Sequence, residues 1–109
     1  MVARERINST CTVFLMNTKY YARANCCGGF DSGAKDTPAE AVNYAIAQLT
    51  TPGGSIYLKD IEIPETLDSY GDNILIIEAA VRDGVYDIRS YSNNKQIASM
   101  REGPVVGPL

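Results

Sequence analysis

The sequence contains no histidine. Histidine is the commonest general base in enzymes and a frequent zinc ligand, so its absence excludes a Ser-His-Asp triad and most zinc sites. It also leaves the chain without a side chain that ordinarily titrates near neutral pH. No constellation of other residues indicates a reaction. We therefore expect a protein that is not an enzyme and that holds neither a cofactor nor a metal.

Two further absences concern partners. Ten Lys and Arg residues against thirteen Asp and Glu residues give a net charge of -3, without the clustered positive surface that nucleic-acid binding needs. No apolar run approaches the ~20 residues that cross a bilayer. The first ten residues carry charges of both signs and do not form a secretory signal. The sequence thus predicts neither a nucleic-acid partner nor a membrane span, and it leaves the compartment open.

The composition predicts a single folded domain over residues 1–109. Hydrophobic residues make up 45% of the chain and charged residues 21%, which are proportions of a globular domain rather than of a disordered chain. Residues 1–10 have no apolar core, and residues 102–109 carry two Gly-Pro breaks. We expect these two ends to be extended or frayed.

The three cysteines, Cys11, Cys26 and Cys27, do not define a disulfide or a metal site. Adjacent cysteines rarely bond to each other, because the ring is strained, but Cys11 could pair with either of the other two and leave one thiol over. Three thiolates without a C-x-x-C pair give weak support for a metal. Small thiols that are buried or half-buried are the favoured interpretation.

The strongest local pattern predicts a helix after Thr37. Thr37 is a good N-cap, Pro38 suits the first helical position, and Glu40 completes a capping box three residues after the cap. The triplet Pro-Gly-Gly at 52–54 ends the helix, because proline cannot continue it and glycine permits positive φ. The buried stripe, spaced i, i+3, i+4, i+7, is Val42, Ala45, Ile46 and Leu49.

Alternating and continuous apolar runs predict several strands around this helix. Turn signals at residues 17–18, 83–84 and 93–94 separate neighbouring strands, the first of them within a hairpin. Residues 61–63 are expected to continue the strand at 55–59 after a bend. The expected strands cover residues 11–16, 19–24, 55–59, 73–78, 85–91 and 96–100.

Residues 36–77 resemble the start of right-handed parallel β-helix proteins of the pectate-lyase-like superfamily. In this family a short amphipathic helix caps the first coil, and a proline or glycine turn leads from it into the first coil strand. The family pattern looks like "DT…AI..AI..L..GG.IYL". In this sequence it stands as Asp36-Thr37, Val42, Ala45-Ile46, Leu49, Gly53-Gly54 and Ile56-Tyr57-Leu58.

The likeness extends on both sides of this pattern, over residues 12–79. Upstream, residues 12–36 look like the hairpin that often precedes the cap in tailspike-like members. Downstream, "GDNILIIEA" at 71–79 is similar to the next coil strand. The sequence departs from the family at 60–64, where Asp-Ile-Glu-Ile-Pro replaces the usual Gly-Thr-Tyr strand.

The resemblance implies a fold that is mainly β with one capping α-helix, a truncated right-handed β-helix-like module. Coils bury their faces only against neighbours, so fewer than about three are rarely stable alone, and the sequence leaves room for about two. We therefore expect a homo-oligomer, and the tailspike-like relatives imply a trimer and a virion or cell-surface location. The alternative is a small α+β domain with an antiparallel sheet. Parallel pairing of the strands at Ile56 and Ile74 would favour the coil.

Two functions follow from these expectations. The leading one is a non-enzymatic structural or assembly module that self-associates. The alternative is a carbohydrate-binding or polysaccharide-degrading domain or fragment, which depends on family likeness alone. The candidates for an oligomer or glycan surface are Tyr20, Tyr21, Tyr57, Tyr86 and Tyr91.

Carboxylates near one another are the remaining candidates for chemistry, since a pair of them could act on a glycoside. Asp83 and Asp87 lie close to Arg89 in the sequence, and Asp68 lies close to Asp72. Solvated turn and strand residues are the favoured interpretation of both groups.

Overall fold

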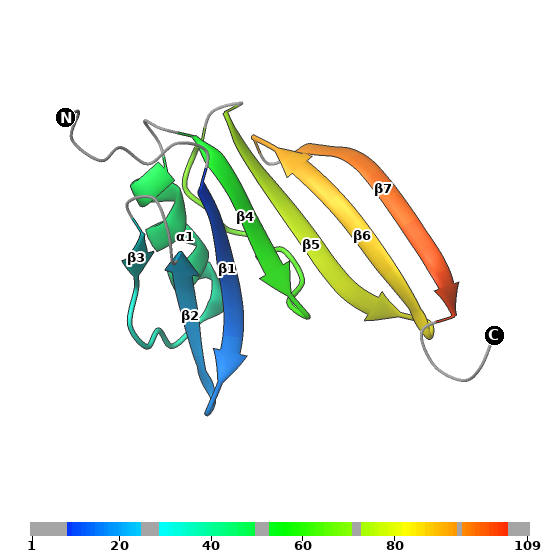
Figure 1. Cartoon of the computed structure of the whole chain (residues 1–109), viewed down its shortest axis with the longest axis horizontal. Coiled ribbons are helices and arrows are strands. Elements are labelled where there is room, and N and C mark those ends of the chain that lie inside the picture. The colour runs from blue at the N-terminus through cyan, green and yellow to red at the C-terminus, as the bar shows by residue number, and fades with distance from the viewer. Residues whose placement is uncertain (1–8, 25–28, 50–52, 71–72, 94, 105–109) are drawn as a thin grey trace.

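A computed structural model of the chain describes residues 9–24, 29–49, 53–70, 73–93 and 95–104. Within these residues seven strands form one mixed sheet, and one helix, α1 (Pro38–Leu49), lies against it (Figure 1). The expectation of a mainly β protein with one helix is confirmed. The strands are β1 Ser9–Met16, β2 Lys19–Ala24, β3 Phe30–Asp31, β4 Gly54–Lys59, β5 Ile74–Arg82, β6 Val85–Ser92 and β7 Lys95–Pro104.

The strand order across the sheet is β3-β2-β1-β4-β5-β6-β7. β4 pairs in parallel with β1 on one side and with β5 on the other, and the remaining neighbours pair antiparallel. Gly54 lies opposite Ile74, and Ile56 lies opposite Ile76. The parallel pairing expected for these two strands is therefore present, and the antiparallel sheet of the alternative is wrong for the centre of the sheet.

The predicted capping box starts α1. The Thr37 hydroxyl accepts the N–H of Glu40 at 3.2 Å, and Glu40 Oε1 accepts the N–H of Thr37 at 3.2 Å and that of Asp36 at 3.0 Å. These bonds satisfy amide groups that have no partner within the helix. The buried side chains of α1 are the predicted stripe together with Ala41, and they pack on β1, β2 and β4.

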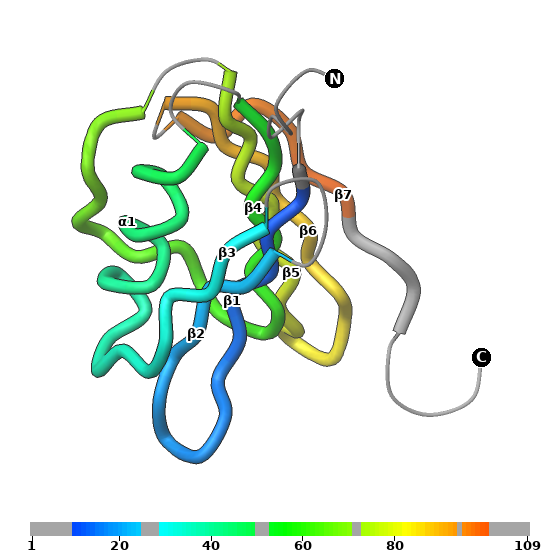
Figure 2. The backbone as a smooth tube through the Cα atoms, turned by 60° about the vertical axis from the view of Figure 1, so that its left-hand side comes forward, coloured from blue at the N-terminus to red at the C-terminus, as the bar shows by residue number. Residues whose placement is uncertain are grey.

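The sheet has two different faces. α1 covers one of them over β1, β2 and β4, and we call this side the helix face (Figure 2). The apolar side chains buried on the helix face include Cys11, Val13, Ala22, Ala24, Ile56, Leu58, Ile74 and Ile76. The opposite side, the open face, is not covered by any element of the described chain. Its half-buried side chains include Thr12, Phe14, Tyr21, Tyr57, Leu75 and Ile77.

Two tight hairpins form at predicted turns. Asn17 and Thr18 have φ values of 53° and 65°, and Asp83 and Gly84 have values of 56° and 75°. Positive φ at both central residues is the type I′ geometry, whose twist matches that of the flanking strands. The strands extend beyond their predicted limits. Residues 9–10 and 102–104, expected in extended or frayed ends, belong to β1 and β7.

The expectation that residues 61–63 continue β4 is wrong. Asp60 adopts a φ of 56°, which turns the chain out of the sheet while its N–H still donates to the carbonyl of Ala79 at 2.9 Å. Ile61 is then buried, and Ile63 packs at the edge of the core. Burial of these isoleucines on the helix face, rather than strand pairing, accounts for the alternation seen in the sequence.

Gly53 connects α1 to β4 in a conformation that other residues adopt with strain. Its φ is +80°, and a Cβ added there would lie 2.8 Å from the carbonyl oxygen of Asn73. Its N–H donates to the carbonyl of Leu49 at 2.7 Å. Gly33 has a similar φ of +73°, but an added Cβ would meet nothing within 4 Å.

We expect Gly53→Ala to lower the free energy of unfolding by about 2–4 kcal/mol, measured by urea denaturation. The left-handed conformation costs roughly 1–2 kcal/mol for alanine, and the overlap with Asn73 adds to that cost. Gly33→Ala is the matched control, because it places alanine in the left-handed conformation without an overlap. Equal losses in the two variants would contradict this account.

Candidate functional site

Beyond Ile76, the helix face of β5 and the adjoining part of β6 carry charged side chains instead of an apolar core. Glu78 and Asp87 are only 1% and 4% exposed. The register of the hairpin sets Glu78 opposite Arg89, and Asp87 opposite Ala80. We call the following residues the charged cluster: Glu62, Glu78, Arg82, Asp87, Arg89 and Tyr91.

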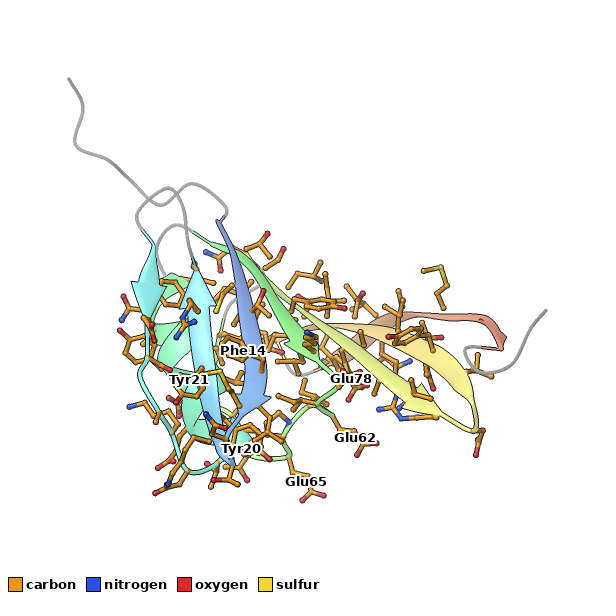
Figure 3. The ribbon with its side chains drawn as sticks, turned by 60° about the horizontal axis from the view of Figure 1, so that its bottom comes forward. Phe14, Tyr20, Tyr21, Glu62, Glu65 and Glu78 are labelled. Atoms are coloured by element: carbon orange, nitrogen blue, oxygen red, sulfur yellow. The ribbon has the colours of Figure 1, made fainter. Side chains whose placement is uncertain are left out.

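Glu78 joins the sheet to the segment that connects β4 with β5 (Figure 3). Its Oε2 accepts the N–H of Ile63 at 2.6 Å. Its Oε1 lies 2.8 Å from Nη2 of Arg82 and accepts the hydroxyl of Tyr91 at 3.5 Å. One buried carboxylate therefore holds the β4–β5 connection, β5 and β6 together.

The two arginines pair with the remaining carboxylates. Arg82 Nε lies 3.3 Å from Glu62, and its Nη1 lies 3.5 Å from Asp87. Arg89 approaches Asp87 with Nη2 at 2.9 Å and Nε at 3.3 Å. No buried side-chain polar atom in the described ranges lacks a hydrogen-bond partner. Such a fully paired arrangement is what a buried ionic group needs to be tolerated.

These contacts raise the pKa of both arginines. Burial alone would lower the pKa of Arg82, but the hydrogen bond and charge of Glu78 outweigh it and raise that pKa. The hydrogen bond from Asp87 raises the pKa of Arg89. Both arginines therefore stay charged, and their ion pairs with the buried carboxylates form an ionic clamp.

Asp83 and Asp87, which were considered for glycoside chemistry, lie in different surroundings. Asp87 is buried in the ion pair with Arg89, whereas Asp83 lies exposed in the β5–β6 turn. Asp68 is exposed too, and its N–H donates to Asn43 Oδ1 at 2.7 Å. Asp72 lies outside the described residues.

The five candidate tyrosines are divided between the two faces. Tyr21, Tyr57 and Tyr86 lie on the open face, where Tyr57 is opposite Thr12 and Ile77, and Tyr86 is opposite Val81. Two others, Tyr20 and Tyr91, pack against the core on the helix face. They do not form one common surface, because strand alternation separates neighbours such as Tyr20 and Tyr21.

Tyr21 belongs to an aromatic stack on β1 and β2 (Figure 3). Its ring centroid lies 5.5 Å from that of Phe14, with an angle of 12° between the planes, and the Arg23 guanidinium lies 5.3 and 5.6 Å from the two centroids. Phe14 was not among the residues predicted from the sequence to form a surface site. Its contact with Tyr21 could have been predicted, because a two-residue turn at 17–18 sets residue 14 opposite residue 21.

A groove of about 610 Å³ lies beside this stack. Three apolar side chains line it, and so do three polar ones that carry a hydroxyl, an ammonium and a carboxylate group. The lining residues are Thr12, Phe14, Leu15, Met16, Lys59 and Asp60. Apolar walls with a few polar groups are typical of small-molecule sites.

The far end of the sheet leaves apolar side chains in solvent. Ile97 and Met100 on β7 are 59% and 54% exposed, and Val81 and Tyr86 are also exposed. Every side chain of β7 from Lys95 to Met100 is exposed, on both faces of the strand. The other large apolar side chains that are exposed among the described residues are Leu15 and Met16, at the end of β1.

Cys11 is a free, buried thiol on the helix face, as the favoured interpretation of the cysteines predicts for it. Burial raises its pKa to about 12, against a smaller opposing effect of a backbone hydrogen bond at Arg23. A thiol with so high a pKa is chemically inert at neutral pH. Cys26 and Cys27 lie outside the described residues.

Other kinds of site have no support among the described residues. They contain no group of three or more acidic or cysteine side chains that could hold a metal ion. No helix among them has the length and apolar character to cross a membrane. Comparisons with protein-family models, with curated proteins and with solved structures found no match to this chain. Function must therefore be argued from the geometry.

Replacing Glu78 tests the ionic clamp. We expect Glu78→Ala to lower the free energy of unfolding by about 3–5 kcal/mol, because it leaves Arg82 and the Ile63 amide without their partner. Glu78→Gln keeps an oxygen acceptor and should cost less, about 1–3 kcal/mol. Glu65→Ala, at an exposed glutamate in the same connection, is the control. A loss for Glu78→Ala no larger than that of the control, in urea denaturation, would refute the clamp.

Proposed function

We propose that the protein is a non-enzymatic structural module, a minimal β-helix-like cap that self-associates. The observation that carries the proposal is the unequal cover of the sheet. α1 protects β1, β2 and β4 on one face, whereas β6 and β7 extend beyond it with exposed apolar side chains. Large exposed apolar surfaces on a folded domain commonly mark interaction sites.

The path of the chain supports the coil interpretation. Gly54 lies opposite Ile74, twenty positions later, so the chain returns to the same level of the sheet one strand further on. Such a length falls in the range of solenoid repeats. The connection between these strands crosses the helix face, where Glu78 holds Ile63, and α1 lies on the same face between β1 and β4. The strand order β1-β4-β5 thus advances in one direction with both crossovers on one side, as in successive coils.

The end of this short stack supports an assembly role. β5 is followed by two antiparallel strands, so the parallel stack does not continue in β6 and β7. Among the described strands none pairs with the outer side of β7, which leaves a long edge of the kind that proteins ordinarily protect or pair. The contact of a second copy with this end of the molecule would protect it.

Sedimentation equilibrium of the wild-type protein tests the proposal. We expect the weight-average mass to rise above the 11.8 kDa of one chain as the concentration increases. The tailspike-like resemblance implies a trimer as the final state, whereas the unequal edges of the sheet favour a dimer. A single species of 11.8 kDa up to the highest soluble concentration would refute self-association.

A carbohydrate-binding domain is the second candidate, and the stack of Phe14 and Tyr21 beside the groove favours it. Flat aromatic rings next to Thr12, Lys59 and Asp60 offer both a stacking surface and hydrogen-bonding groups for a sugar. The groove lies on the open face, away from the buried charged cluster.

Glycan-array binding distinguishes this candidate. We expect a sugar ligand, if bound in the groove, to lose at least about tenfold in affinity on Phe14→Ala or Tyr21→Ala, since a stacking platform is removed. Tyr86→Ala, on the same face but remote from the groove, is the control. Absence of binding across a broad array would leave only the assembly role.

A further inference from the structure

We infer that two copies of the protein pair through β7, edge to edge and antiparallel, about a two-fold axis near the middle of the strand. The inference rests on the proposed self-association and adds the surface and the symmetry by which it takes place. It follows from the unequal edges of the sheet, from the exposure of β7, and from the position of its protective features.

The two edges of the sheet offer very different lengths for pairing. β3 forms one edge with only two residues, whereas β7 forms the other with ten. Pairing of β7 with β3 of another copy would use two residues of the shorter strand and would leave free edges for further copies. Pairing of β7 with β7 uses the long strand in both copies and closes after two, because the same surface meets itself.

The exposure of β7 leaves it with little support from its own chain. Each side chain from Lys95 to Met100 is exposed, so neither face of this part of the strand is buried. Its order depends on pairing with β6. In an antiparallel ladder, alternate residues of a strand direct their backbone N–H and C=O groups to opposite sides. Every second residue of β7 therefore bonds to β6, and the residues between them direct N–H and C=O away from the sheet. A second β7 would satisfy these groups.

Features that normally block edge pairing lie toward the ends of β7. Lys95 begins the strand and Pro104 ends it, and irregular register interrupts the ladder between Ser90 and Tyr91 and again between Val85 and Asp87. Lysine, proline and bulges are the usual protective devices at an edge. The middle of β7, from Ala98 to Met100, has regular register and no such device.

Small residues in this middle section allow close approach. In an antiparallel pair centred on Ser99, Met100 of each copy lies opposite Ala98 of the other. Both residues belong to the open face, because they pair with Ile88 and Ser90 of β6. The pairing would therefore join the exposed apolar side chains of the two copies across the axis.

Lysines placed in this section test the inference. Ala98→Lys with Met100→Lys adds two positive charges to each β7, and like charges would meet across the axis. The matched control, Leu15→Lys with Met16→Lys, adds the same charge to exposed apolar positions on β1, which lies four strands from β7 in the sheet. Circular dichroism and thermal unfolding verify the fold of both variants. Ser99→Lys, which sets two lysines opposite each other, repeats the test with one change should the double variant unfold.

Pairing of two edge strands buries less than the ~1,600 Å² of a standard interface, so we expect a micromolar Kd. Sedimentation equilibrium of all variants is therefore measured from about 1 to about 500 μM. We expect a wild-type dimer, a Kd raised at least about tenfold by the β7 lysines, and little change in the control. A wild-type trimer, or a dimer that the β7 lysines leave intact, would overturn β7 pairing while self-association stands. A wild-type monomer throughout would overturn both.

Discussion

The parallel pairing of β4 with β1 and β5 beneath α1 is the constraint on which the rest of the structure depends. Parallel strands cannot be joined by a short turn, so each connection must cross a face of the sheet. In this protein both connections use the helix face, and their apolar side chains form the core there. The core is therefore one-sided, and everything beyond β5 has to be stabilised by other means.

Those other means differ along the sheet. At β5 and β6 the charged cluster takes the place of apolar packing, and Glu78 ties the β4–β5 connection to both strands. A buried ionic group contributes little net stability but is costly to break, so it favours one arrangement over others. At β7 there is neither an apolar core nor a buried ion pair among the described side chains, and within the described chain the strand pairs with β6. Stabilisation thus declines from α1 toward β7, and the interaction surface we propose lies where it is weakest.

Local sequence signals predicted much of this fold. Thr37, Pro38 and Glu40 defined the helix start, and the turn residues Asn17-Thr18 and Asp83-Gly84 defined two hairpins, because capping and positive φ depend on chemistry within a few residues. The role of Glu78 was not predictable, since its partners come from three separate segments. The division of the tyrosines between faces could have been derived from strand alternation. Residues 61–63 leave the sheet because one residue, Asp60, adopts a left-handed conformation. The strand-like pattern around Asp60 gave no sign of this.

Hydrogen–deuterium exchange at increasing protein concentration tests the central claim, that the molecule completes its sheet by joining another copy. The account predicts that amides in the middle of β7 exchange more slowly as the concentration rises, while amides of β3, at the opposite edge, do not change. Exchange in β7 that is independent of concentration, over a range in which the mass increases, would contradict it.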